Sequence, residues 1–129
     1  MTEEPVWLLR PVVLVAHEDQ LSEHGGMPGI RDENLLESAL ARPRNLYAYG
    51  SPTLIELGAA YAAGITRNHP FLDGNKRTGF LAMFIFLERN GVELTATQAE
   101  ATAAMLALAE GSIAEDQFVK WIEDHSRVR

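Results

Sequence analysis

Residues 69–77 gather the side chains of this sequence that are best suited to chemistry. They supply one imidazole, one carboxylate, a Gly-Asn pair and two adjacent cations. Pro70 and Gly74 suit a sharp turn between two helices, because proline fixes the backbone and glycine tolerates conformations that other residues avoid. A base, a metal-binding group and an anion site within one turn are typical of a phosphate-transfer site.

The helix predicted over residues 75–90 gives this turn an end that attracts anions. Its first backbone N–H groups have no partner within the helix, and the positive end of the helix dipole lies there. Gly74 allows close approach of a ligand, while Lys76 and Arg77 add a point charge and a bidentate fork for phosphate oxygens. We therefore expect Gly74, Asn75, Lys76 and Arg77 to bind the phosphate groups of a nucleotide.

Two titratable side chains complete the predicted site. A carboxylate beside bound phosphates is unfavourable unless a cation neutralises it, so Asp73 is expected to hold Mg²⁺ together with phosphate oxygens. Histidine is the side chain that most readily takes up and releases a proton near neutral pH, so His69 is expected to take the proton from an attacking hydroxyl group. Pro70 and Phe71 are expected to support the loop, with Phe71 pointing inward.

The whole segment resembles the signature loop of the Fic/Doc (Fido) superfamily, whose usual form is His-Pro-Phe-x-x-Gly-Asn-Gly-Arg-x-x-Arg. Lys76 stands where Fic proteins have glycine, and Phe80 stands where they have the last arginine. This is the pattern of the Doc (death-on-curing) toxin branch, and the resemblance continues through residues 25–43. It implies an all-α Fido domain over residues 1–129, a compact bundle of about six helices with a short flap before the central helices.

The resemblance also implies an activity. A Doc-like protein transfers the terminal phosphate of ATP, with Mg²⁺, to a hydroxyl group of a protein target, for which the family suggests an elongation factor of the Tu type. The self-inhibitory helix of many Fic enzymes has no counterpart here, since Leu106 stands where its Ser or Thr belongs. The resemblance therefore implies restraint by a separate antitoxin of the Phd kind.

Two alternative functions stay open. The first is transfer of AMP, as in Fic adenylyltransferases; Phe80 disfavours it because it cannot grip nucleotide phosphates beside Arg77, as an arginine would. The second is a module that binds phosphate without catalysis. His69 argues against that module, because simple phosphate binding gives the imidazole no purpose.

Composition limits the remaining possibilities. The chain has 129 residues with 47% hydrophobic content, which is enough for one core, and its formal charge of −7 argues against general affinity for nucleic acids or anionic membranes. It contains no cysteine, which excludes disulfides and thiolate chemistry. Residues 1–5 lack the basic start of a signal peptide, so we expect a cytoplasmic protein. The apolar run at residues 80–87 is shorter than the roughly 20 residues of a membrane span and predicts the buried centre of the bundle.

Helices are predicted along most of the chain. Start and stop signals favour helices over residues 11–24, from Asp32 to Arg42-Pro43, and from a start at Ser51-Pro52 to residue 68. Two capping boxes predict the starts of two later helices, namely Thr97 with Glu100 and Ser112 with Glu115.

Residues 42–50 form the least regular segment of the sequence. By position the segment resembles the flap of Fido proteins, which aligns a target strand over the active site. Arg44 or Tyr47 would then contact the target or the nucleotide; the alternative is a surface connection with tyrosines packed on the bundle. Outside the loop we expect structural or solvent-exposed roles for His17, His24 and His125, and a local ion pair of Arg31 with the capping residue Asp32.

Overall fold

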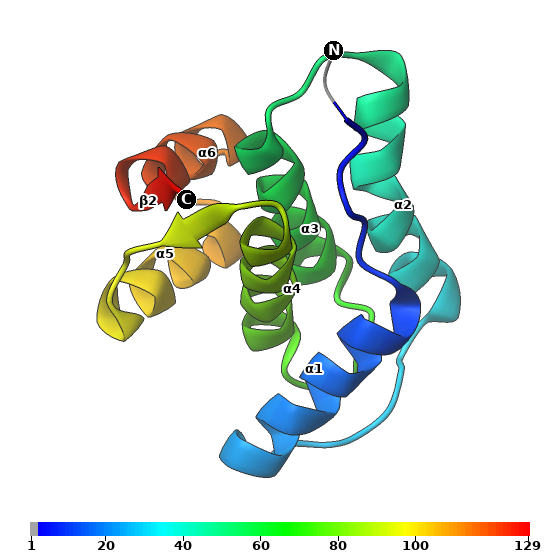
Figure 1. Cartoon of the computed structure of the whole chain (residues 1–129). Coiled ribbons are helices and arrows are strands. Elements are labelled where there is room, and N and C mark those ends of the chain that lie inside the picture. The colour runs from blue at the N-terminus through cyan, green and yellow to red at the C-terminus, as the bar shows by residue number, and fades with distance from the viewer. Residues whose placement is uncertain (1–2) are drawn as a thin grey trace.

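The computed structural model describes residues 3–129. Met1 and Thr2 lie outside the described residues, although they belong to the expected domain and to the N-terminal residues examined for a signal peptide. Within residues 3–129 there are six helices, which confirms the expected helical bundle of about six helices, and two short strands that an all-α fold does not include (Figure 1). In chain order they are α1 (Arg10–His24), α2 (Glu33–Tyr49), α3 (Leu54–Asn68), α4 (Asn75–Arg89), β1 (Val92–Leu94), α5 (Gln98–Glu110), α6 (Glu115–Asp124) and β2 (Ser126–Val128).

Helix α3 runs through the centre of the molecule, between α2 and α4, with α6 at its side (Figure 1). Every residue from 57 to 66 is buried. Two glycines allow close helix contacts: a Cβ at Gly58 would lie 2.9 Å from Leu87 of α4, and one at Gly64 would lie 3.4 Å from Ala39 of α2. The tight packing of α3 against α4 fixes the loop that joins them, which is the predicted site.

The ends of α3 and α5 follow the capping rules, although one cap is displaced. The box of Thr97 with Glu100 forms as predicted, with the Glu100 N–H donating to the Thr97 hydroxyl at 3.1 Å. The expected cap of α3 at Ser51 is wrong, because the chain stays extended until Thr53. Thr53 caps the helix through a reciprocal pair of bonds with Glu56, and that pair satisfies two backbone donors at once.

The predicted cap of α6 at Ser112 is also wrong. Helix α6 starts after Ala114, whose backbone N–H donates to the side chain of Gln117 at 2.7 Å. A glutamine three residues into the helix can therefore supply half of a capping box without a capping hydroxyl. Ser112 remains in the preceding turn, and Glu115 instead binds Arg42 and Arg67 across the surface.

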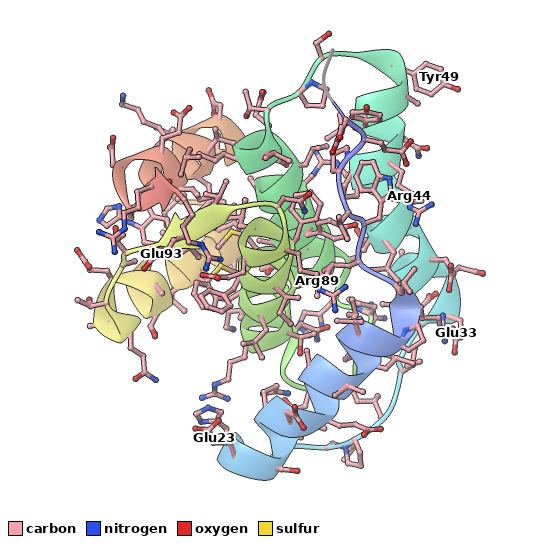
Figure 2. The ribbon with its side chains drawn as sticks, viewed as in Figure 1. Glu23, Glu33, Arg44, Tyr49, Arg89 and Glu93 are labelled. Carbon is pink, nitrogen blue, oxygen red and sulfur yellow. The ribbon has the colours of Figure 1, made fainter. Side chains whose placement is uncertain are left out.

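The prediction of an irregular flap at residues 42–50 is wrong, because α2 continues through Pro43 to Tyr49. Proline removes one helical hydrogen bond, but tertiary contacts hold the turns that follow. Tyr47 packs edge-on against Trp7, with ring centroids 5.5 Å apart, and the guanidinium of Arg44 lies 5.5 Å from the centre of the same ring. Figure 2 shows Arg44 beside the N-terminal segment and Tyr49 pointing outward. Arg44 and Tyr47 are both absent from the lining of the cleft that contains the predicted site.

Two further features were not predicted. Strands β1 and β2 pair in antiparallel register, Val92 with Val128 and Leu94 with Ser126, and each has three residues, too few to show alternation in a sequence. The apolar helix α4 is also less enclosed than expected, because Phe86 is fully buried whereas Phe84 is 36% exposed. No helix within residues 3–129 has both the length and the apolar character that crossing a membrane would require.

Candidate active site

His69 lies at the C-terminal end of α3 in a left-handed backbone conformation, with φ of 56°. It is the one non-glycine residue of positions 3–129 with positive φ, a conformation that costs about 1–2 kcal/mol. Its N–H donates to Ile65 O at 3.1 Å and so closes the helix, while its side chain is exposed and faces a cleft. The surrounding structure therefore holds the expected base in a strained position.

Arg31 supports this position from the segment between α1 and α2. Its guanidinium donates to the carbonyl oxygens of His69 at 2.7 Å and Asn68 at 3.0 Å. A cation at the carbonyl end of a helix is favourable, because unpaired carbonyl groups point toward it. The expected ion pair with Asp32 is wrong: Asp32 caps α2 by accepting the N–H of Leu35 at 3.0 Å.

Residues 25–32 lie beside the loop, in the position expected for the flap at residues 42–50. The backbone N–H groups of Arg31 and Asp32 both donate to Pro70 O, and Leu72 N donates to Gly29 O at 3.1 Å. Ile30 forms an isolated antiparallel bridge with Phe71. This segment therefore holds the loop through main-chain contacts.

Inside the loop, Asn75 and Phe71 form a closed pair of hydrogen bonds. The Oδ1 of Asn75 accepts the N–H of Phe71, and its Nδ2 donates to Phe71 O, each at 2.9 Å. Both residues are buried, with Phe71 fully enclosed. The side chain of Asn75 is therefore occupied by Phe71, and only the backbone N–H of Asn75 can bind a phosphate.

His17 of α1 supports the other side of the loop. Its ring stacks on Phe71 with centroids 3.9 Å apart, and its Nε2 lies 2.9 Å from Asp73 O. Because a carbonyl oxygen only accepts, Nε2 carries the proton in this contact. His17 is 4% exposed, so the structural role expected for it is now specific: it fixes the backbone that carries Asp73.

Asp73 itself is exposed and faces the cleft. One carboxylate oxygen, Oδ2, accepts the N–H of Met27 at 3.1 Å, which orients the side chain. No group of three metal-binding side chains exists within residues 3–129. A cation held here would therefore need most of its ligands from elsewhere, which suits Mg²⁺ bound through one carboxylate, phosphate oxygens and water.

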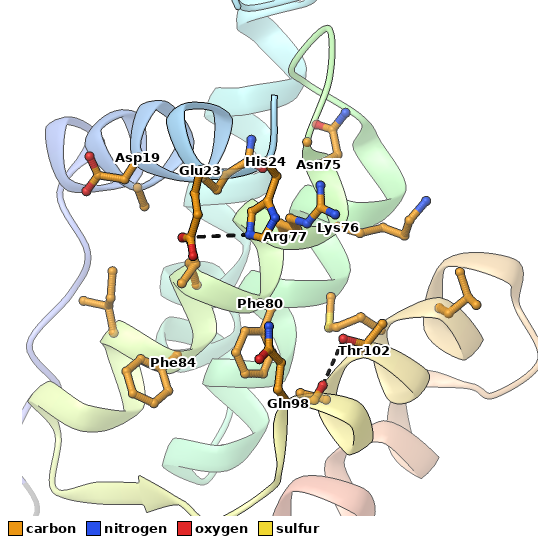
Figure 3. Close-up of a pocket in the computed structure, with 18 of the residues that line it drawn as sticks. Asp19, Glu23, His24, Asn75, Lys76, Arg77, Phe80, Phe84, Gln98 and Thr102 are labelled. Carbon is orange, nitrogen blue, oxygen red and sulfur yellow. Dashed lines mark hydrogen bonds and ion pairs between the residues drawn. The ribbon is translucent and has the colours of Figure 1, made fainter. Parts of the chain in front are cut away.

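Helix α4 begins at the mouth of the same cleft. Gly74 precedes it with φ of 77°, and a Cβ there would lie 1.9 Å from Nε2 of Gln20, so both backbone conformation and space require glycine. Lys76 and Arg77 are exposed, and no ion pair engages either one in the described part of the chain. Figure 3 shows both side chains at the start of α4.

The cleft has a volume of about 860 Å³ and brings together all six residues expected to act directly: His69, Asp73, Gly74, Asn75, Lys76 and Arg77. Helix α1 forms one wall and α5 the other, with α4 between them (Figure 3). Beyond Arg77 the lining becomes apolar, with Phe80 and Phe84 of α4 and Met105 of α5. The cleft thus has a charged end and an apolar end, in proportions that suit a nucleotide.

Helix α1 also contributes to the cleft, which was not predicted from the sequence. Asp19, Gln20, Glu23 and His24 all line the cleft, and Figure 3 shows Glu23 and His24 opposite Lys76 and Arg77, with a nitrogen–oxygen distance of 3.9 Å between Glu23 and His24. Asp19 and Glu23 are four residues apart, as are Gln20 and His24, so the sequence indicates that each pair shares a face of the helix. It does not indicate that this face is directed toward α4. Acidic groups facing a phosphate site favour a bound cation.

Comparison with known proteins gives results that agree with this geometry. A family described as the Fic/DOC family matches residues 7–87, which include α1, the loop and most of α4. A protein kinase doc of Escherichia phage P1 is 38% identical over 88 residues, which are 67% of this chain and 70% of that protein. A toxin Doc of Mycolicibacterium smegmatis is 43% identical over 74 residues, which are 56% of this chain and 57% of that protein.

Proposed function

Because the chain belongs to the Fic/DOC family, we propose that it is a protein kinase of the Doc type, which transfers the γ-phosphate of ATP to a hydroxyl group of a protein. The observation that carries this proposal is the arrangement of one cleft. There the exposed imidazole of His69 and the carboxylate of Asp73 meet the N-terminal end of α4, with Lys76 and Arg77. These groups supply a base, a cation ligand and an anion site within one small volume.

In the proposed reaction, the phosphates of ATP lie against the backbone N–H groups at the start of α4, with Lys76 and Arg77 beside them. His69 takes the proton of the target hydroxyl as its oxygen forms a bond to the γ-phosphorus. The bond from that phosphorus to the bridging β–γ oxygen breaks, so ADP leaves and the proton stays on the imidazole. Such transfer depends on positioning and charge stabilisation, which this set of residues supplies.

Mg²⁺ fits the donor set, and Asp73 is the residue that would hold it. The Met27 N–H occupies one carboxylate oxygen and so orients the group toward the cleft. When bound, Mg²⁺ would neutralise charge on the β- and γ-phosphates. Asp19 and Glu23 on the facing wall add negative charge that favours the same cation.

The apolar end of the cleft supports phosphate transfer over AMP transfer. Transfer of AMP requires the α-phosphate at the position of attack, with the β- and γ-phosphates gripped farther along. Phe80 follows Arg77 on α4 and lines the cleft, where its ring stacks near Phe84 with centroids 6.3 Å apart. An aromatic pair offers apolar contact to a base or to a target side chain, but no charge for additional phosphates.

The biological role forms a further part of the proposal. The relative named toxin Doc supports a toxin that a separate antitoxin of the Phd kind restrains. An elongation factor of the Tu type, in the cytoplasm, is the proposed target. The apolar end of the cleft, between α4 and α5, is the surface we assign to the antitoxin, because an amphipathic segment bound there would also obstruct the phosphate site.

The test uses ATP labelled at either the α or the γ phosphate, with Mg²⁺ and a cell lysate. Label on protein from γ-labelled ATP alone supports the proposal, whereas label from the α position alone would establish AMP transfer instead. His69→Ala should reduce labelling about 10²–10⁴-fold. His125→Ala provides a matched histidine control, because His125 packs on Trp121 away from the cleft, and this variant should retain labelling. Absence of label from both forms, with purified elongation factor Tu also present, would favour a non-catalytic module.

A further inference from the structure

Gln20 of α1 has a buried side-chain amide that the fold leaves without hydrogen bonds. The residue is 3% exposed, and within residues 3–129 neither its Oε1 nor its Nε2 has a hydrogen-bond partner. A buried amide without partners lowers the stability of a protein, because it has lost its bonds to water. Such a group in a native structure needs an explanation, and a bound ligand is one.

The position of the Gln20 amide limits the kinds of ligand that it could bind. Its Nε2 lies so close to Gly74 that a Cβ there would be 1.9 Å away, and Gln20 lines the cleft with Asp73 and Lys76. Gly74 directly precedes α4, and the Thr78 N–H donates to Gly74 O at 3.0 Å in the first turn of that helix. The amide therefore stands at the anion-binding end of α4, beside N–H groups that have no partner within the helix.

A phosphate would use the nitrogen of the Gln20 amide and not its oxygen, because phosphate oxygens accept hydrogen bonds. Asp19, Glu23 and His24 line the same wall, so α1 presents two acidic residues, one imidazole and one neutral amide to the cleft. An amide can donate a hydrogen bond to a phosphate oxygen without bringing charge. The terminal torsion of a glutamine side chain has a broad energy profile, so a small rotation can direct its amide toward a bound ligand.

We propose that Gln20 is a phosphate-binding residue, which donates a hydrogen bond from Nε2 to the polyphosphate of the bound nucleotide. The inference rests on the proposed ATP-dependent function, but it concerns binding and so can be tested apart from transfer. It completes the charged end of the cleft with a donor from the wall opposite Lys76. It also accounts for an unpartnered amide, because the bond forms when the nucleotide is bound.

A structural role for Gln20 makes the opposite prediction for one measurement. If the amide only fills space above Gly74, replacing it should leave nucleotide affinity unchanged. If it awaits a ligand, Gln20→Met should raise the melting temperature of the ligand-free protein, since an apolar side chain of similar size removes unpaired polar groups. The same change should weaken nucleotide binding, so stability and affinity should move in opposite directions.

The experiment measures binding of ATP with Mg²⁺ by calorimetry, together with the melting temperature of each ligand-free variant. Gln20→Met should weaken binding about 10- to 100-fold, as loss of one hydrogen bond to a charged group predicts. Gln20→Glu keeps the shape and should bind more weakly still, because it places a like charge against phosphate. Glu18→Gln, an exposed change on α1 outside the cleft, is the matched control and should change affinity less than about twofold.

Inorganic triphosphate separates a phosphate contact from a contact with the nucleoside. Its affinity should fall by the same factor as that of ATP in Gln20→Met; unchanged affinity for triphosphate would overturn the assignment. Gln20→Ala replaces the methionine variant if the latter fails to fold. Wild-type affinity for ATP in all Gln20 variants would overturn the inference and leave the kinase proposal intact. If wild-type protein binds ATP but transfers no γ-label, the kinase proposal fails and the Gln20 contact is still measured.

Discussion

Replacing Asn75 by alanine tests which part of this residue serves the site. Asn75 was expected to bind phosphate, yet its side chain is buried and its amide bonds both the N–H and the carbonyl oxygen of Phe71 at 2.9 Å. Alanine would leave these two enclosed backbone groups without partners. We therefore expect Asn75→Ala to destabilise the fold, and to weaken nucleotide binding chiefly because the loop loses its shape.

The magnitude follows from the contacts. Each orphaned buried group costs about 1–3 kcal/mol, while alanine recovers about 0.5 kcal/mol through better helix propensity. The expected net loss is about 2–5 kcal/mol, a large share of the roughly 5–15 kcal/mol that stabilises a typical domain. At about 4 °C per kcal/mol for a chain of this length, the melting temperature should fall by roughly 8–20 °C.

Urea denaturation followed by circular dichroism measures the loss, with a lower midpoint and an unchanged slope expected. Lys76→Ala is the neighbouring control: Lys76 is exposed and outside every ion pair of the described residues, so its loss should reduce ATP affinity at wild-type stability. The reasoning is refuted if Asn75→Ala has the wild-type midpoint but no affinity for ATP, because the side chain would then act directly on the ligand.

Three further outcomes are expected. His69→Ala should reduce γ-label transfer about 10²–10⁴-fold while ATP affinity stays within a few-fold of wild type, and a parallel loss of affinity in calorimetry would contradict its role as base. Arg31→Ala should reduce transfer through a displaced His69, while Arg31→Lys restores part of it; labelling rates for both variants check this, and equal rates for alanine and wild type would disprove it. Burial raises the pKa of Tyr61 in the folded protein above the value of about 10 that a tyrosine has in an unfolded chain. Below that unfolded pKa the shift does not affect stability; at higher pH the free energy of unfolding falls, because the unfolded chain loses the phenolic proton first. A Tyr61→Phe variant should show less of this loss in alkaline denaturation, and an identical pH profile would rule out Tyr61 as its source.

The sequence was most informative where local rules decide the structure. The glycine before α4 and the capping box at Thr97 each depend on nearby residues, and the helices they predicted are found. The loop from His69 onward belongs to the same class, because a short turn between two packed helices leaves few arrangements. Its polar and charged residues line one cleft.

The sequence was less informative where distant contacts decide. Helix α2 passes Pro43 because Trp7 packs against the turns that follow, and no local pattern announces such a contact. The facing direction of Gln20 depends on how α1 lies across α4, which periodicity alone does not specify. Arg31 likewise binds the end of a helix 37 residues away in the sequence. Only the structure could show that it binds carbonyl groups of α3.

The two walls of the cleft come from different portions of the chain. Helix α1, the loop and α4 lie almost wholly within the region that matches the family, whereas α5 lies outside residues 7–87. The residues proposed for phosphate transfer and the apolar lining that α5 contributes therefore lie on separate stretches of the chain. If a partner binds the apolar end as proposed, exchange of residues 98–106 should change which partner binds there, while the phosphate site on the loop and α4 stays the same.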